Sequence, residues 1–290
     1  MSQRIFGSFG ALMTGKEPNK DLMSLDTISV FENLKESGAL LFRDFDVNMD
    51  SFREFSDQFA SEHLKHGLPK LRAGMSEDGT VADVLAGTHD IVLHGEMYYL
   101  PKQPDILWLF CQKPALHGGA TTVCDGIEYL NALTPALKAL FNKKKILYTH
   151  RWGPTGWQAI FKTDSIDQAI SELKRDPRVS SAKFDGEFLT FDYVTSAIMR
   201  PKYSSTPAFI NSIANVKQYA YLNTVDVKFE DGEQITPEMV EEINEIGSLV
   251  VKDVSWQAGD VLMIDNSRVM HGRRNFSGER KISTRFSKAS

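Results

Sequence analysis

The fold of this chain of 290 residues is decided by residues 259–273, which have the sequence GDVLMIDNSRVMHGR. An apolar run from Val261 to Ile264 is followed by the turn-forming pair Asp265-Asn266 and by a second run that carries His271. Short apolar runs bounded by turn residues are typical of β-strands. The stretch therefore predicts a strand, a turn and a neighbouring strand that delivers a histidine.

Strand signals continue on both sides of this stretch. Short runs of β-branched and aromatic residues, separated by turn residues, occupy positions 38–42, 91–100, 106–111, 120–124, 250–256 and 281–286. Many short strands with turns between them are typical of a sandwich or a barrel. We therefore expect a mainly β fold with helical decoration.

Helices are expected between some of these strands. After Asp50 or Ser51, either of which can cap a helix, three phenylalanines between positions 52 and 59 recur at helical spacing. Further along, Thr236-Pro237 combines a capping hydroxyl with a proline in the first turn, and Gly247 is the expected stop of that helix. Both helices are predicted to bury one face in the core.

Composition restricts the class of protein. Hydrophobic residues make up 42% of the chain and charged residues 24%, which is ordinary for a globular protein and excludes a disordered or fibrous one. The 38 acidic and 33 basic residues give a net charge of -5, so we expect no nucleic-acid partner. Small molecules are the expected ligands.

Cysteine content and the lengths of the apolar runs bear on the compartment. Two cysteines, Cys111 and Cys124, are too few for the disulfide framework of a small secreted protein. The apolar runs are shorter than the roughly 20 residues that cross a bilayer, and the N-terminus lacks the Ala-x-Ala site of a signal peptide. We expect a cytoplasmic enzyme with no membrane partner.

No composition shift, linker or repeat divides the chain. We therefore expect one domain over residues 1–290. Residues 155–235 have the least regular pattern, and we expect them to form an insert or a lid.

His94-Gly95-Glu96 is the first candidate site. On a strand, side chains two positions apart point to the same face, so the imidazole and the carboxylate would converge as two metal ligands. With 7 histidines and 38 acidic residues, about one such pair arises by chance. The plain alternative is a core histidine beside a surface salt bridge.

His271 is the candidate third ligand. Two histidines and one carboxylate on one face of an octahedral ion are typical of non-haem Fe(II), because three adjacent positions stay open for co-substrate and oxygen. Zinc sites are more often closed. Beyond His271, Arg285 would need an anionic partner inside a β-barrel, and a carboxylate matches its geometry best, with Arg280 as the alternative cation.

Together these residues resemble the TauD/TfdA group of Fe(II)- and 2-oxoglutarate-dependent oxygenases. The matching residues, which cover the chain from about position 38 to its end, are His94-x-Glu96, Gly118-Gly119-x-Thr121, the Asp265-Asn266 turn, His271-Gly272-Arg273 and Arg285. The glutamate in the first motif and the residues around both histidines look most like the SyrP-like and clavaminate-synthase-like branch.

The resemblance implies a double-stranded β-helix, the cupin-like jelly roll, flanked by helices, with Fe(II) held by His94, Glu96 and His271. It implies that Arg285 and the hydroxyl of Thr121, rather than that of the adjacent threonine, hold the distal carboxylate of 2-oxoglutarate, and that O2 is the other co-substrate. Such enzymes release succinate and carbon dioxide while removing hydrogen from an unactivated C–H bond. Halogenation is not expected, because halogenating relatives have a small residue where this chain has Glu96.

The resemblance also implies the substrate class, an amino acid or an amino-acid-derived metabolite of specialised metabolism, free or tethered to a carrier protein. The product would be hydroxylated, desaturated or cyclised. Arg72 and Arg274 are candidates for binding a substrate carboxylate, and Trp157 is a candidate for the pocket wall. The plain alternatives are solvated charges for the two arginines and a core position for the tryptophan.

Two other functions fit part of the pattern. A zinc-dependent hydrolase could use the same three ligands, but it would give Arg285 and Thr121 no role. A noncatalytic jelly-roll binding module would make the clustering of the ligands accidental.

Overall fold

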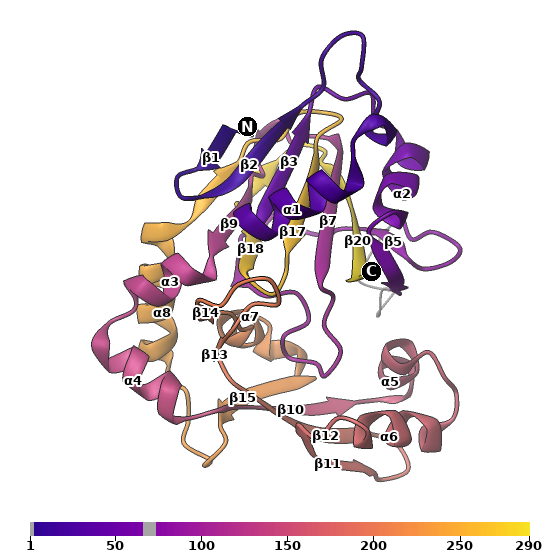
Figure 1. Cartoon of the computed structure of the whole chain (residues 1–290). Coiled ribbons are helices and arrows are strands. Elements are labelled where there is room, and N and C mark those ends of the chain that lie inside the picture. The colour runs from indigo at the N-terminus through magenta and orange to yellow at the C-terminus, as the bar shows by residue number, and fades with distance from the viewer. Residues whose placement is uncertain (1–2, 66–73) are drawn as a thin grey trace.

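The computed structural model describes residues 3–65 and 74–290, and its centre is a pair of facing β-sheets (Figure 1). The larger sheet has the strand order β1-β2-β3-β17-β7-β20-β4, with β5 paired to β20. Its strands are β1 (Gln3–Phe6), β2 (Phe9–Thr14), β3 (Ala39–Arg43), β4 (Ala60–Leu64), β5 (Val81–Asp83), β7 (Ile106–Lys113), β17 (Val261–Asp265) and β20 (Lys281–Ala289). The smaller sheet has the order β16-β9-β18-β6 and consists of β6 (Ile91–His94), β9 (Thr121–Asp125), β16 (Lys252–Val254) and β18 (Val269–Arg273).

Both faces of the larger sheet are buried, and the sequence of β7 shows why. Its even-numbered residues, including Trp108, pack against the first two helices, whereas its odd-numbered residues, including Leu109, face the smaller sheet. A strand buried on both faces needs apolar residues at every position, which explains the uninterrupted run 106–111. The two helices are α1 (Thr27–Ser37) and α2 (Met49–Asp57), and they lie across the outer face of the sheet (Figure 1).

The cap of α2 differs from the prediction. Asn48, rather than Asp50 or Ser51, is the N-cap, because its side chain accepts from the backbone N–H of Ser51 while the Ser51 hydroxyl accepts from the N–H of Asn48. This reciprocal pair is a capping box. The predicted apolar face is confirmed, since Phe52 and Phe55 are fully buried.

Two predicted strands are shorter than expected. The run 91–100 is a strand only as far as His94 and then becomes a turn, in which Met97 has a φ of 61°. Likewise, the run 250–256 is a strand only over Lys252–Val254, because α8 extends through Val250. The strands β17 and β18 flank the predicted Asp265-Asn266 turn, but they belong to opposite sheets, so this turn carries the chain across the sandwich.

A third sheet, with the order β11-β12-β10-β15, lies beside the sandwich in the lower part of Figure 1. Its strands are β10 (Ile146–Trp152), β11 (Val179–Phe184), β12 (Leu189–Thr195) and β15 (Val225–Phe229). The helices before, between and after its strands are α3 (Gly126–Ala132), α4 (Pro135–Lys143), α5 (Pro154–Phe161), α6 (Ile166–Lys174), α7 (Ile213–Gln218) and α8 (Pro237–Val250). Elsewhere the chain forms the 3-10 turns Leu22–Ser24 and Ala220–Leu222 and the short strands β8 (His117–Gly118), β13 (Ile198–Met199), β14 (Ala208–Phe209) and β19 (Phe276–Ser277). The expected mainly β fold with helices is confirmed.

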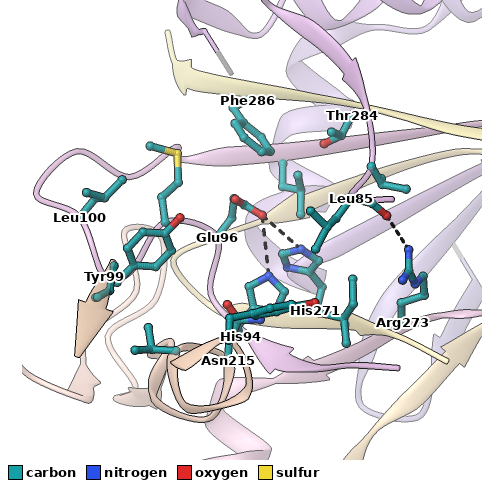
Figure 2. Close-up of a pocket in the computed structure, with 18 of the residues that line it drawn as sticks. Leu85, His94, Glu96, Tyr99, Leu100, Asn215, His271, Arg273, Thr284 and Phe286 are labelled. Carbon is teal, nitrogen blue, oxygen red and sulfur yellow. Dashed lines mark hydrogen bonds and ion pairs between the residues drawn. The ribbon is translucent and has the colours of Figure 1, made fainter. Parts of the chain in front are cut away.

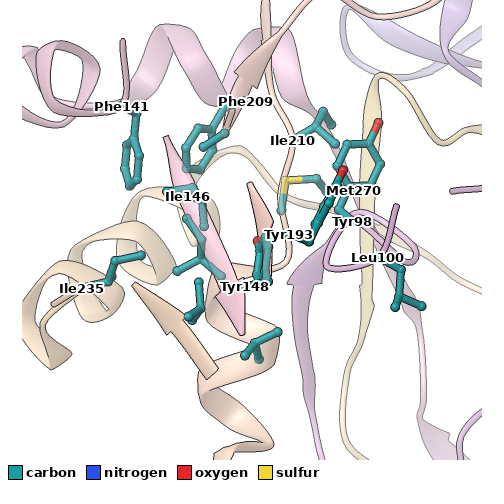
Figure 3. Close-up of a cluster of buried hydrophobic side chains, with 14 of the residues drawn as sticks. Tyr98, Leu100, Phe141, Ile146, Tyr148, Tyr193, Phe209, Ile210, Ile235 and Met270 are labelled. Atoms are coloured by element: carbon teal, nitrogen blue, oxygen red, sulfur yellow. The ribbon is translucent and has the colours of Figure 1, made fainter. Parts of the chain in front are cut away.

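One apolar cluster joins the third sheet to the turn that follows β6 (Figure 3). In it, Tyr98 and Leu100 from the turn are packed in the same cluster as Tyr148 and Tyr193, whose stacked rings lie 6.3 Å apart. His150 is fully buried in the same region, where burial lowers its pKa to about 3, and its Nε2 lies 2.7 Å from the carbonyl oxygen of Tyr99. The turn is therefore supported from below by a well-packed layer. No helix in the described ranges is both long and apolar enough to cross a membrane.

The prediction that Gly247 ends α8 is wrong. The helix continues to Val250, and Gly247 is a buried position inside it. A Cβ on Gly247 would lie 2.7 Å from the hydroxyl oxygen of Tyr129, which itself donates a hydrogen bond to the carbonyl of Ile243. The absence of a side chain therefore lets α8 approach α3 closely.

We predict that Gly247→Ala lowers the free energy of unfolding by about 1–3 kcal/mol, because the added methyl group overpacks the contact with Tyr129. In an uncrowded helix the same change would stabilise by roughly 1 kcal/mol. Urea denaturation of the variant measures the sign, and Ser248→Ala, on the exposed side of the same helix, is the control. A more stable Gly247→Ala variant would contradict the packing described here.

Candidate metal centre and co-substrate pocket

His94, Glu96 and His271 converge at the mouth between the two sheets (Figure 2). His94 and His271 are register partners on β6 and β18, and their ring centroids are 4.3 Å apart. The Oε2 atom of Glu96 lies 3.5 Å from Nε2 of His271 and 3.9 Å from Nε2 of His94. One donor atom from each residue falls within 4.8 Å of the other two, so the three side chains could hold one metal ion.

The orientation of His94 suits a metal ligand. Its Nδ1 lies 2.9 Å from the carbonyl oxygen of Val92, to which an N–H at that position donates. This fixes the tautomer and leaves the lone pair of Nε2 directed toward Glu96. The Nε2 atom of His271 faces the same carboxylate.

Glu96 reaches the site from a turn and not, as expected, from the strand that carries His94. Gly95 permits the sharp departure, because a Cβ there would lie 2.5 Å from Cδ2 of Tyr98. Ser212 then donates from its hydroxyl to the carbonyl of Gly95 at 2.8 Å. The convergence of the two motif residues was predicted, but the strand geometry proposed for it was wrong.

Asn266 holds Glu96 in place from the opposite sheet. Its Oδ1 accepts from the backbone N–H of Glu96 at 2.8 Å, and its Nδ2 donates to the carbonyl of Glu96 at 3.1 Å and to that of Pro104 at 2.9 Å. The side chain is fully buried and all its hydrogen-bonding groups have partners. The sequence identified Asn266 only as a turn residue, and its partner lies 170 positions away.

His94, Glu96 and His271 line a cavity of about 650 Å³. Most of its lining is apolar, with Leu107 and Leu109 from β7 and Phe286 from β20 at its base. Thr121 and Arg280 are among the polar groups in the wall. A large apolar cavity with few convergent polar groups is the usual form of a small-molecule site.

Thr121 and Arg280 form one polar corner of this cavity. The Thr121 hydroxyl accepts from Nε1 of Trp256 at 3.0 Å and from the Arg280 guanidinium at 3.4 Å. Arg280 also donates to the carbonyl of Gly119, which has a φ of 71°. The adjacent Thr122 lines a different pocket behind the sheet, so Thr121 is the inward-facing residue of the pair. Trp256 was not predicted as a site residue, because it was assigned to a strand.

Burial and the nearby charge of Arg273 lower the pKa of Arg280 to about 10. The guanidinium therefore keeps its positive charge at neutral pH. Its hydrogen-bond partners among the described residues, the carbonyl of Gly119 and the hydroxyl of Thr121, are uncharged. A partly buried cation whose hydrogen-bond acceptors are neutral favours an anionic ligand.

Arg285 does not lie beside Thr121 and Arg280 in the cavity. On β20 the side chains of Thr284 and Phe286 line the cavity, so Arg285 points to the other face of the sheet. There its guanidinium contacts Asp57 at 2.7 Å and donates to the hydroxyl of Ser56 at 2.7 Å. The expectation that Arg285 faces the co-substrate is therefore wrong, and the alternative, Arg280, takes that position.

The three substrate candidates are also outside the cavity or beyond the described residues. Arg274 is half exposed, pairs with Asp253 at 3.1 Å and is absent from the cavity wall. Trp157 is buried against Phe184 in the layer of α5 and the third sheet. Arg72 lies outside the described residues.

This chain is similar to several known proteins. The family described as "Taurine catabolism dioxygenase TauD, TfdA family" matches residues 7–286. The dapdiamide synthesis protein DdaC of Enterobacter agglomerans is 26% identical over 280 residues, which cover 87% of this chain and 82% of that protein. A clavaminate synthase-like protein of Arabidopsis thaliana is 26% identical over 273 residues, covering 86% and 81%.

Solved structures show the same fold. PvcB of Pseudomonas aeruginosa has a TM-score of 0.64 at 14% identity, covering 99% of this chain and 90% of that one. A second PvcB structure, described as an Fe, alpha-ketoglutarate dependent oxygenase from an isonitrile synthetic pathway, scores 0.63 with the same identity and coverage. AAD-2 in complex with Mn(II) and N-oxalylglycine scores 0.63 at 15% identity, covering 100% and 97%. The expected jelly roll is confirmed.

We predict that Asn266→Ala weakens Mn(II) binding by about 10- to 100-fold, because the turn that carries Glu96 loses its tie to the opposite sheet. Competition with a chromophoric chelator measures the affinity. Asn142→Ala, which removes a surface asparagine that bonds only within its own helix, should leave Mn(II) affinity unchanged. A folded Asn266→Ala variant with the affinity of the parent would disprove the positioning role.

Proposed function

The chain belongs to the TauD/TfdA family of Fe(II)- and 2-oxoglutarate-dependent dioxygenases, and on that basis we propose a role for each residue of the cavity. His94, Glu96 and His271 hold the Fe(II) ion. Arg280 and the hydroxyl of Thr121 bind the distal carboxylate of 2-oxoglutarate. When bound, the ion supplies O2 activation coupled to decarboxylation of 2-oxoglutarate, which allows attack on an unactivated C–H bond.

One observation carries this proposal: a two-histidine, one-carboxylate set lines the same cavity as the partly buried guanidinium of Arg280, which has no carboxylate partner among the described residues. The donor set suits Fe(II), which binds imidazole and carboxylate and keeps positions open for other ligands. The guanidinium suits a dicarboxylate that must be held at a distance from the ion. A zinc hydrolase would use the donor set but has no role for Arg280 and Thr121.

The chain's own residues prepare the site before any ligand enters. The carbonyl of Val92 fixes the His94 tautomer, and Asn266 fixes the backbone of Glu96. The apolar base of the cavity excludes water from the space beside the ion, which strengthens the electrostatic contacts within it. Trp256 orients the Thr121 hydroxyl by donating to its oxygen.

For the substrate, we propose an amino acid or an amino-acid-derived metabolite of specialised metabolism in the cytoplasm, free or tethered to a carrier protein. The similarity to a dapdiamide synthesis protein supports this class. The reaction is a hydroxylation, a desaturation or a ring closure, since all three begin with removal of hydrogen from the same substrate carbon.

Residues 155–235 are proposed to act as a lid within the single domain. Ile160 of α5, Asn215 of α7 and Val225 of β15 line the cavity from this segment, which therefore covers the substrate side of the metal centre. Active-site lids often come from segments inserted beside a rigid scaffold.

We predict that the protein, given Fe(II) and 2-oxoglutarate without oxygen, develops the visible charge-transfer band of the chelate. His94→Ala should lose the band because one of three ion ligands is removed. Absorption spectroscopy under anaerobic conditions measures both. A colourless parent protein would contradict the oxygenase assignment and favour a hydrolase or a binding module.

The choice between the two arginines gives a second prediction. Arg280→Gln should raise the 2-oxoglutarate concentration needed for half-maximal chelate colour by at least about 10-fold while leaving Fe(II) affinity nearly unchanged, because only the anion partner is lost. Arg285→Gln is the matched variant on the other face of the sheet and should keep the co-substrate affinity, with reduced stability because the buried guanidinium's contacts with Asp57 and Ser56 are lost. The reverse order of effects would return the role to Arg285.

A further inference from the structure

The side chains of the cavity wall carry more positive charge than is needed to balance Fe(II) and 2-oxoglutarate. Among the described residues of its wall, Lys65, Arg273 and Arg280 are cationic and Glu96 is the acidic one. The two positive charges of Fe(II) balance the two negative charges of 2-oxoglutarate, so the wall retains a positive excess. If the proposed function holds, this excess points to a second anionic group, carried by the substrate.

Arg273 is the cation placed to receive it. It follows His271 by two positions on β18, so the two side chains lie on the same face of the strand and both line the cavity. Only 4% of Arg273 is exposed. In Figure 2 its guanidinium lies to one side of the histidine pair and contacts Leu85.

The hydrogen bonds of Arg273 go to backbone carbonyls. It donates to the carbonyl of Leu85 at 2.8 Å and to the carbonyl of His89 at 2.9 and 3.3 Å. A guanidinium has five N–H groups, so these three bonds leave two for another acceptor. Its cation also lies 5.2 Å from the ring centroid of Phe276. Within the described chain, no ion pair of Arg273 with a carboxylate is found.

Three other arginines with mostly buried side chains have carboxylate partners. Arg43 pairs with Asp260 at 2.6 Å, Arg268 pairs with Asp125 at 2.6 Å, and Arg285 pairs with Asp57 at 2.7 Å. All three lie outside the cavity wall. Arg273 and Arg280, the arginines of the cavity wall, differ from these three because neither has an ion pair with a carboxylate in the described chain.

Both cavity arginines lie near the ring of Phe276. The guanidinium of Arg280 lies 5.6 Å from its ring centroid, close to the 5.2 Å of Arg273. Two carboxylates can therefore occupy neighbouring positions without sharing one cation. Beyond Arg273, the wall contains apolar side chains such as Ile91, Val216 and Leu222.

We propose that Arg273 binds the carboxylate of the substrate, so that the substrate class is a carboxylate with an apolar body. Anchored two strand positions from His271, such a molecule has its nearby carbons beside the metal centre and its apolar part against the lid segment. The competing explanation is structural: Arg273 only ties residues 85–89 to β18. That explanation predicts no preference for an anion.

The test uses hexanoate and hexanamide as probes, because they share their apolar chain and differ in charge. Binding is measured by calorimetry or ligand-observed NMR on protein loaded with Mn(II) and 2-oxoglutarate, which occupies Arg280. We expect the parent to bind hexanoate at least 10-fold more tightly than hexanamide. Arg273→Gln should abolish this preference, whereas Arg274→Gln, which alters a neighbouring arginine outside the cavity, should retain it.

Arg273→Lys keeps the charge but not the planar donor pair, so it should retain a reduced preference and remains informative if Arg273→Gln does not fold. The proposal is overturned if the parent does not bind hexanoate, if it binds both probes equally, or if the folded variants keep the full preference. Formation of the coloured Fe(II)–2-oxoglutarate chelate is measured first, on a separate anaerobic sample of each variant. A missing chelate refutes the proposed function, whereas a normal chelate without carboxylate preference refutes only the role of Arg273.

Discussion

The hydrogen bonds between the Asn266 side chain and the backbone of Glu96 are the constraint on which the candidate metal centre depends. Two of the donor residues are aligned by strand pairing, because β6 and β18 place His94 and His271 opposite each other. The third donor comes from a turn, which strand pairing cannot fix. Asn266, at the point where the chain crosses from one sheet to the other, supplies the missing restraint with both ends of its amide.

This constraint links the core to the chemistry. The crossing segment is anchored because β17 is buried on both faces between β3 and β7, so Asn266 begins from a rigid position. On the other side, the turn after β6 rests on the apolar cluster that includes Tyr98, Leu100 and the third sheet. Packing on both sides of the cavity therefore holds an open coordination site in shape without a metal ion, which is what a site with free positions for co-substrates requires.

Local patterns in the sequence were sufficient for the mainly β fold class. The resemblance to the TauD/TfdA group supplied the jelly roll and the three candidate donors, whose side chains the structure brings together. The sequence-based prediction failed where the alternation of side chains along a strand decides which arginine faces the cavity. Thr284 and Phe286 of β20 line the cavity, so Arg285 between them points to the opposite face, whereas Arg280, just before the strand, lines the cavity. The same alternation separates Arg274, which faces outward, from Arg273, which lines the cavity. Contacts such as that between Trp256 and Thr121 join residues 135 positions apart and leave no local signal.

An anaerobic crystal structure with Fe(II) and 2-oxoglutarate tests the central claim most directly. The account predicts one ion bound by Nε2 of both histidines and by the Glu96 carboxylate, with the distal carboxylate of 2-oxoglutarate on Arg280 and Thr121. An ion bound elsewhere, a coordination sphere closed by protein atoms, or a co-substrate that bypasses Arg280 would contradict it.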